Sequence, residues 1–243
     1  MPEGREDVAV VLHSWPWKES SLILRVLTRS HGRIGVVGRG LRGRNRGHVV
    51  LPGQPVTMQW VPGRELGTLQ SLHPLPPLRA LPGGDNWWAL QYVLEVLLQV
   101  APENEPQDGL LDDYLRVLDA LSEAGADPAA PLRRFEWAVL RSAGLAVDLC
   151  HDSDGRPTED TTRYVLVADA GLQRSTSRQA RPGAHWRALV QGHLEADVAR
   201  GLRPAVQRQL ERLVDFSRLR SREQWRAARR LRDSLSAEGG PPR

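Results

Sequence analysis

Five arginines stand among glycines in residues 33–47, and a guanidinium group is suited to binding phosphate. They are Arg33, Arg39, Arg42, Arg44 and Arg46. The same stretch spells G-x-G-x-x-G from Gly38 to Gly43, the pattern of a turn that binds a dinucleotide. Two kinds of chemistry are therefore open. The stretch is either a cradle for one pyrophosphate or a basic loop that follows the backbone of a polynucleotide.

The residues that follow the glycines argue against a dinucleotide site. Such a site needs a helix directly after the turn, so that the pyrophosphate meets the helix N-terminus. The next residues, RNRGHVVLPGQP, hold two further glycines, a β-branched pair and two prolines, and they predict no helix. The hypothesis that the protein is a nucleotide-utilising enzyme is therefore supported only by the match to the G-x-G-x-x-G pattern.

The wider surroundings favour a nucleic-acid backbone. Eight arginines and no acidic residue lie between Glu19 and Glu65. Successive guanidinium groups can neutralise successive phosphates and release their counterions. Further candidates for phosphate contacts are Arg25, Arg29 and Arg64. The alternative is a solvated basic loop without a partner.

Nearby aromatic residues allow two interpretations. Trp15, Trp17 and Trp60 could stack on bases, as in proteins that bind single strands, or belong to the core or rim of a small barrel. We expect a barrel role for at least one of them. His13, in an apolar strand, is expected to be structural rather than catalytic.

Composition sets further limits. Residues 1–80 hold 11 Lys or Arg and 5 Asp or Glu, residues 81–160 hold 5 and 16, and residues 161–243 hold 17 and 8. This basic, acidic and basic order indicates separate surfaces for separate partners. The single cysteine, Cys150, excludes an internal disulfide and a multi-cysteine metal site. Because a signal-peptide pattern and long apolar segments are lacking, we expect a cytoplasmic protein.

Hydrophobic periodicity predicts a β-rich part followed by a helical part. Short apolar runs with turn signals over residues 8–80 indicate a small barrel or sandwich, and a proline-rich connector follows. Helices are predicted at 87–100, 109–125, 131–149, 183–200, 204–216 and 221–235. Asp85 or Asn86 is expected to cap the first helix, and Ser221 with Gln224 the last. A hairpin region is predicted at about 152–175, and a disordered tail at about 236–243.

Several blocks in order along the chain resemble the bacterial recombination mediator RecO family. The first is VVLHSWPWKESSLILRVLTRSHGRIGVVGRGLR, and the second is LPGQPVTMQWVPGRELGTLQSLH. PLRRFEWAVLRSAGLAVDLCH resembles the helix of the family with R-R-F-E, and RLRSREQWRAARRL its closing basic stretch. The resemblance implies an α+β protein with an N-terminal OB-fold barrel (1–80) and a mainly helical domain (81–243) that carries a small β-hairpin.

The resemblance also implies a function in binding rather than catalysis. It predicts a DNA repair and recombination protein, associated with the nucleoid, that binds single- and double-stranded DNA and anneals complementary strands. With RecR, it would help to load RecA onto DNA coated by single-strand DNA-binding protein. Arg133 and Leu132 would dock the acidic, hydrophobic tail of that coating protein. The alternative for Arg133 and Arg134 is a surface ion pair with Glu136 or a nearby aspartate. Many members hold zinc with four cysteines, but we expect no metal or cofactor here. An RNA-binding OB-fold protein remains a second possibility.

Overall fold

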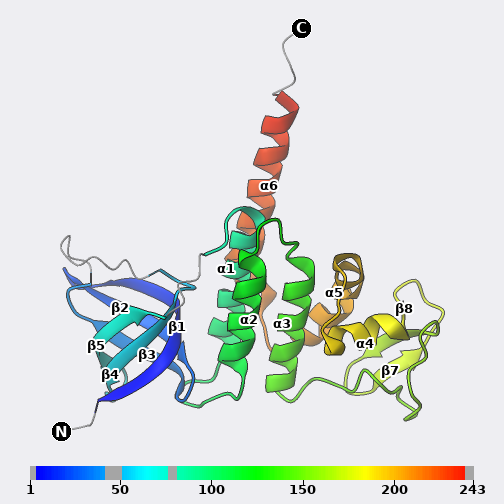
Figure 1. The fold of residues 1–243 in the computed structure, drawn as a ribbon, viewed down its shortest axis with the longest axis horizontal. Coiled ribbons are helices and arrows are strands. Elements are labelled where there is room, and N and C mark those ends of the chain that lie inside the picture. Colours follow the sequence, from blue (N-terminus) through cyan, green and yellow to red (C-terminus); the bar gives the residue numbers. More distant parts are fainter. Residues whose placement is uncertain (1–3, 42–50, 76–80, 239–243) are drawn as a thin grey trace.

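The computed structural model describes residues 4–41, 51–75 and 81–238, with a β-barrel, a helical bundle and a small sheet arranged in a row (Figure 1). Five strands form the barrel: β1 (Arg5–Trp17), β2 (Ser21–Thr28), β3 (Gly32–Gly38), β4 (Pro55–Val61) and β5 (Gly67–Pro74). They close in the order β1-β2-β3-β5-β4, with β4 pairing back to β1 and β5 parallel to β3. This is the arrangement of an OB fold, and the predicted fold class is confirmed.

Alternation along the strands separates the barrel interior from its outer surface. The side chains that fill the interior are mainly aliphatic, and Trp60 joins them with 3% of its surface exposed. One tryptophan therefore has the barrel role that the sequence predicted. The other interior residues are Ala9, Val11, Leu24, Val26, Ile34, Val36, Val56 and Met58.

The remainder of the described chain is mainly helical. Its helices are α1 (Gly84–Val100), α2 (Leu110–Ser122), α3 (Ala129–Ser142), α4 (Gly183–Gln191), α5 (Ala196–Leu210), the short η1 (Phe216–Arg218) and α6 (Arg220–Glu238). A three-stranded sheet of β6 (Arg163–Val167), β7 (Gly171–Arg174) and β8 (Arg181–Pro182) interrupts them. The expected hairpin is β6 with β7. No helix among the described residues combines the length and apolarity needed to cross a membrane.

The helix boundaries differ from prediction where a glycine or proline interrupts the pattern. The helix predicted at 131–149 is α3, which ends at Ser142, and Gly144 just beyond it adopts φ 70°. The helices predicted at 183–200 and 204–216 are instead α4 and α5, which Gly192 separates by adopting φ 86°. Pro204, expected at a helix start, lies inside α5. Proline lacks the backbone N–H that would donate a hydrogen bond within the helix. Pro204 is exposed, so the missing bond lies on the solvent side of α5, where the helix tolerates it.

Both predicted N-caps are wrong. The N-cap of α1 is Gly83, and Asn86 instead donates from its side-chain amide to the carbonyls of Leu121 and Ala126. Ser221 is buried, and its hydroxyl and backbone N–H both donate to the carboxylate of Glu95 on α1. Both side chains thus form hydrogen bonds with residues far away in the sequence rather than with the first turn of their own helix. Residues 236–238, expected in a disordered tail, belong to α6, and 239–243 lie outside the described residues.

The outer side of the barrel and the helices share a hydrophobic core, separate from the barrel interior. Val10, Leu12 and Leu27 point outward from β1 and β2 and are buried with side chains of α1 and α2. The strand register of β1 against β2 shifts between Val11 and His13, a β-bulge at Leu12. On the N-terminal side of the bulge the helices cover the outer surface of β1, which we call the covered half. Beyond it, from His13 on, the outer surface of β1 is not covered by the helical core, and we call this the open half.

Two glycines make this close packing possible. Gly53 adopts φ +87°, and a Cβ there would lie 3.0 Å from the side chain of Leu90 on α1. Gly32 adopts φ +67°, and a Cβ there would lie 2.0 Å from the backbone oxygen of Glu105. The carbonyl of Gly53 also accepts a buried hydrogen bond from the hydroxyl of Tyr114 on α2. Each contact joins the barrel directly to the helical part.

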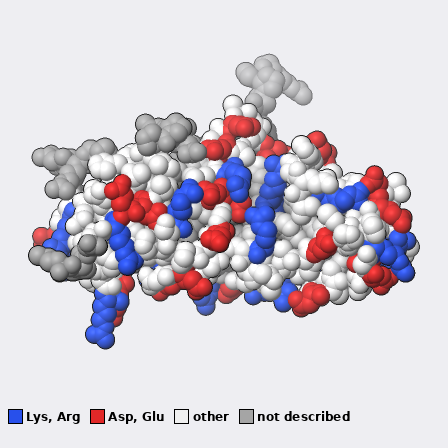
Figure 2. Space-filling view, turned by 60° about the horizontal axis from the view of Figure 1, so that its bottom comes forward, with Lys and Arg blue, Asp and Glu red and all other residues white. Residues whose placement is uncertain are grey.

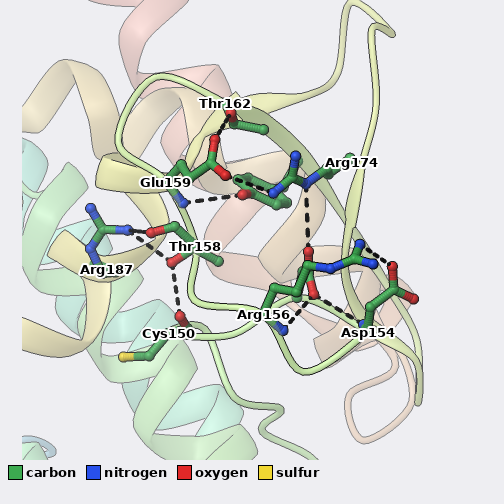
Figure 3. A network of polar contacts seen from close by, with 10 residues as sticks. Cys150, Asp154, Arg156, Thr158, Glu159, Thr162, Arg174 and Arg187 are labelled. Carbon is green, nitrogen blue, oxygen red and sulfur yellow. Dashed lines mark hydrogen bonds and ion pairs between the residues drawn. The ribbon is translucent and has the colours of Figure 1, made fainter.

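Loop residues 150–160 are fixed by a polar network next to the small sheet (Figure 3). Asp152 accepts hydrogen bonds from the backbone N–H groups of Asp154 and Arg156 at 3.0 and 2.9 Å. Arg174 on β7 pairs with Glu159 at 2.8 Å and with Asp152 at 3.6 Å. The loop is thereby attached to the sheet through two carboxylates.

A threonine and an arginine complete the network. The hydroxyl of Thr158 donates to the carbonyl of Cys150 at 3.1 Å, and Arg187 on α4 donates to the same hydroxyl at 2.8 Å. The thiol of Cys150 is exposed. Among the described residues no cluster of three or more His, Cys, Asp and Glu could hold a metal ion. A four-cysteine zinc site does not fit this segment, because the chain has one cysteine.

The bond between Tyr114 and Gly53 yields a stability prediction. Tyr114→Phe keeps the ring but leaves a buried carbonyl without its donor, which should cost about 1–3 kcal/mol of unfolding free energy. Urea denaturation followed by tryptophan fluorescence measures this cost. An unchanged midpoint would show that the bond does not stabilise the junction.

A second prediction concerns acid stability. Hydrogen bonds from the backbone N–H of Arg156 and then Asp154, with the charges of Arg156 and Arg174, hold the pKa of Asp152 below its usual range. Its stabilisation is present above the unfolded pKa of about 3.9 and is lost as pH falls through the lower folded pKa. Asp152→Asn should therefore lower the melting temperature at pH 7, and the difference from wild type should shrink below about pH 4. A difference independent of pH between 7 and 2 would contradict this.

Candidate functional site

Three rings lie on the open half of the barrel, on the outer side of β1. They are His13, Trp15 and Trp17, and the rings of the first two are 5.6 Å apart at 34°. His13, expected to be structural rather than catalytic, is exposed, because the bulge at Leu12 turns it outward. Trp17 has 44% of its surface exposed. The arrangement offers flat apolar faces to a ligand in solvent.

Strands β2 and β3 continue this surface. The register places Arg25 opposite His13 and Gly35, and Ile23 opposite Trp15 and Val37. The side chain of Arg25 is 29% exposed. A cation therefore lies directly beside the row of rings. We call the outer surface of His13, Trp15, Trp17, Arg25 and Val37 the open barrel face.

Further cations lie at one end of this face. Leu22 pairs with Gly38 and Trp17 with Ser21, which brings the end of β3 close to the turn between β1 and β2. That turn holds Lys18, and Arg39 follows β3; both are exposed. The predicted Arg42, Arg44 and Arg46 come next in the chain and lie outside the described residues. The residues in which a dinucleotide site would need its helix therefore also lie outside the described residues.

The other predicted arginines have different surroundings. Arg33 donates from Nε to the carbonyl of Ala101 at 2.8 Å and lies 3.5 Å from the carboxylate of Glu103. Arg29 makes a two-pronged ion pair with Asp112 at 2.8 and 3.2 Å. Both connect the barrel to the helical part.

Arg64 is exposed in the β4–β5 loop. It borders a small cavity of about 220 Å³ that His31 and Trp60 also line. Figure 2 shows one face of the molecule on which positive and negative side chains alternate rather than gather in one basic patch. The charge of this surface alone therefore does not locate a binding site, and each arginine has to be judged by the residues around it.

A second hollow, the helical cavity, lies among α1, α3, α5 and α6, with a volume of about 590 Å³. Its apolar wall includes Leu132, Ala129 and Trp225. Leu132, a predicted docking residue, is 7% exposed there. The arginines that line the cavity are Arg133, Arg200, Arg203, Arg222 and Arg226.

A buried ion pair forms the floor of the helical cavity. Arg133 and Glu136 are 3% and 0% exposed, and the guanidinium binds the carboxylate with two nitrogens. Tyr92 donates to the same carboxylate at 2.7 Å, and burial, with the charge of Glu136, raises the pKa of Tyr92 well above its usual value. Of the two interpretations of Arg133, its pairing with Glu136 is observed, and the pair is buried rather than at the surface.

Arg200 pairs with Asp127 and Asp197, so the excess positive charge of the helical cavity comes from Arg203, Arg222 and Arg226. Burial and the nearby charges of Arg133 and Arg222 lower the pKa of Arg203, so this guanidinium lies among like charges. Arg203 and Arg222 both donate to the amide oxygen of Gln207, at 3.3 and 3.4 Å. An anion that entered the cavity would relieve this repulsion.

Sequence reasoning did not identify the contributions of α5 and α6 to this cavity. One available signal was the spacing of Arg222 and Arg226, which lie four residues apart in a helix predicted to be basic and amphipathic. Residues at this spacing share one helix face. Nothing local to Arg203 indicates that it faces α3.

Two family profiles match the chain, "Recombination protein O N terminal" over residues 4–77 and "Recombination protein O C terminal" over residues 83–233. A DNA repair protein RecO from Xanthomonas oryzae pv. oryzae is 37% identical over 171 residues, 70% of this chain and 71% of that protein. One from Polaromonas sp. is 34% identical over 192 residues, 76% and 77% of the two chains. One from Variovorax paradoxus is 34% identical over 245 residues, 90% and 95% of the two chains. The predicted resemblance is confirmed, and the chain belongs to the recombination protein O family, RecO.

Proposed function

We propose that this protein acts in DNA repair by binding single-stranded DNA on the open barrel face. The observation that carries the proposal is the row of His13, Trp15 and Trp17 beside Arg25 on an OB-fold barrel. Strands 2 and 3 of an OB fold, with the loops next to them, are its usual surface for oligonucleotides. Family membership supports a role in DNA repair.

The chemistry of this face suits a strand of any sequence. Bases stack on aromatic rings whatever their identity, and cations along the groove hold the phosphates. Lys18 and Arg39 extend the positive charge from one end of the rings, and the predicted Arg42, Arg44 and Arg46 would continue it. If about five cations neutralise phosphates, log K should fall with log salt at a slope of roughly −3.5.

We further propose that the helical cavity binds the acidic, hydrophobic tail of single-strand DNA-binding protein. An apolar side chain at the end of such a tail fits beside Leu132, and the carboxylates of the tail fit the excess of arginines. Arg203 and Arg222 are the cations that we assign to those carboxylates. Arg133 would contribute its positive charge at the floor of the cavity rather than a direct hydrogen bond, because its guanidinium is already bound to Glu136.

The remaining functions are proposed on family membership alone. They are binding to double-stranded DNA, annealing of complementary strands, and loading of RecA together with RecR, by binding rather than catalysis, in the cytoplasm at the nucleoid. An RNA-binding role is the second candidate, because stacking on rings does not distinguish the two sugars. A nucleotide-utilising enzyme is disfavoured by the sequence after Gly43, RNRGHVVLPGQP, which predicts no helix.

Removal of the exposed ring tests the DNA site. Trp17→Ala should weaken binding of a single-stranded oligonucleotide by about 5- to 100-fold, because a stacked base contributes about 1–3 kcal/mol. Trp17→Phe should recover most of the loss. Fluorescence anisotropy at one salt concentration, with DNA and RNA of the same sequence, measures both variants. Val190→Ala removes an exposed apolar side chain elsewhere and should have no effect. Unchanged affinity of Trp17→Ala would refute this placement, and a stronger preference for RNA would favour the second candidate.

Charge removal tests the helical cavity. Arg203→Ala should weaken binding of a peptide with three aspartates and a C-terminal phenylalanine by about tenfold or more, since a charge-assisted hydrogen bond contributes about 1.5–3 kcal/mol. Affinity for single-stranded DNA should stay nearly constant. Arg134→Ala is the matched control, because Arg134 is exposed on α3 and does not line the cavity. Calorimetry with the peptide measures both, and equal losses in the two variants would contradict the assignment.

A further inference from the structure

The connector between α1 and α2 lies along the edge of the open barrel face. Its backbone pairs with β3: Arg33 donates to the carbonyl of Pro102 at 3.1 Å, and Asn104 donates to the carbonyl of Arg33 at 3.0 Å. Gly32, which carries no side chain, lets the connector approach this closely. Glu103, between the two hydrogen-bonded residues, is therefore held at a fixed position beside β3.

Two arginines from different strands converge on the carboxylate of Glu103. One of its oxygens lies 3.3 Å from a nitrogen of Arg25 on β2 and 3.5 Å from a nitrogen of Arg33 on β3. The bond from Arg33 to the carbonyl of Ala101 fixes the orientation of that guanidinium. The two cations thus form a preorganised anion site, and an acidic side chain of the protein occupies it.

The exchange of this carboxylate for a phosphate is physically reasonable. The side chain of Glu103 is 50% exposed, and an ion pair so open to water is weak. A phosphodiester offers two oxygens to guanidinium groups, and it brings counterion release that a carboxylate of the same chain cannot. Arg25 lies directly opposite His13, so a phosphate bound here would belong to a strand stacked on the rings of β1.

We propose that Arg25 and Arg33 form a phosphate subsite of the DNA interface, and that Glu103 occupies this subsite in the free protein. The inference rests on the proposed DNA binding by the open barrel face. A bound strand displaces the carboxylate, which remains nearby and returns when the strand leaves. Glu103 thereby limits the affinity for DNA and favours release of the strand.

Glu103→Gln tests the subsite, because it removes the competing charge at nearly constant shape. Affinity for single-stranded DNA should rise roughly threefold to tenfold, and the slope of log K against log salt should steepen by up to about 0.7, the value of one phosphate contact. Glu105→Gln is the matched control. It changes the net charge equally from an exposed position two residues along the connector, and its gain should be clearly smaller.

A double-mutant cycle assigns the gain to the arginines. In an Arg25→Ala background, Glu103→Gln should raise affinity much less than in wild type. Equal gains for Glu103→Gln and Glu105→Gln, or a full gain without Arg25, would overturn the subsite. Wild-type protein that does not bind single-stranded DNA would instead refute the proposed function. Urea midpoints of all variants, measured in parallel, identify any loss of affinity that comes from unfolding.

Discussion

The packing of the barrel against α1 and α2 determines which part of the barrel is available to a ligand. Val10, Leu12 and Leu27 are outward-facing residues that would be exposed on an isolated barrel, and here they are buried in the core of the helical part. Burial of apolar side chains of this size is the main favourable term in folding. The helices therefore cover one half of β1, and the bulge at Leu12 leaves the other half, with its three rings, open.

The same junction explains why arginines that look alike in the sequence have different environments. Arg29 and Arg33 lie near the covered half and pair with acidic residues of the helical part, whereas Arg39 lies beyond the open end. Spacing along the chain showed that these residues cluster. It could not show which of them face an acidic partner, because Glu103 and Asp112 are about 70 to 80 residues away in the sequence. The arginine cluster predicted an interface in this part of the chain, and the structure adds that the rings of β1 form a row beside Arg25.

Periodicity predicted the strands and the first two helices well, because each has a regular apolar stripe, but it extended the third helix past its end at Ser142. Local sequence patterns gave wrong predictions where a polar residue forms its hydrogen bonds with a distant residue. Ser221 carries the pattern of a capping residue, yet Glu95 on α1 accepts both of its hydrogen bonds. Pro204 was expected to start a helix, yet α5 runs through it, with Leu202 and Val206 on either side buried in the core. The pair of Arg133 and Glu136 is local and could be anticipated, but its burial could not, because residues of α5 and α6 surround it.

The shared core has a consequence for binding two ligands at once. A barrel tethered by a flexible linker would let its surface move independently of the helical cavity. Here the buried contacts, together with the bonds from Tyr114 and Arg33, join the two parts, so the open barrel face and the helical cavity keep a set separation. If the cavity binds the tail of a protein that coats DNA, as proposed, this separation would determine the effective concentration of DNA at the barrel. Avidity would then depend on the length of the tail between the coated strand and the cavity, and not only on the strength of either contact.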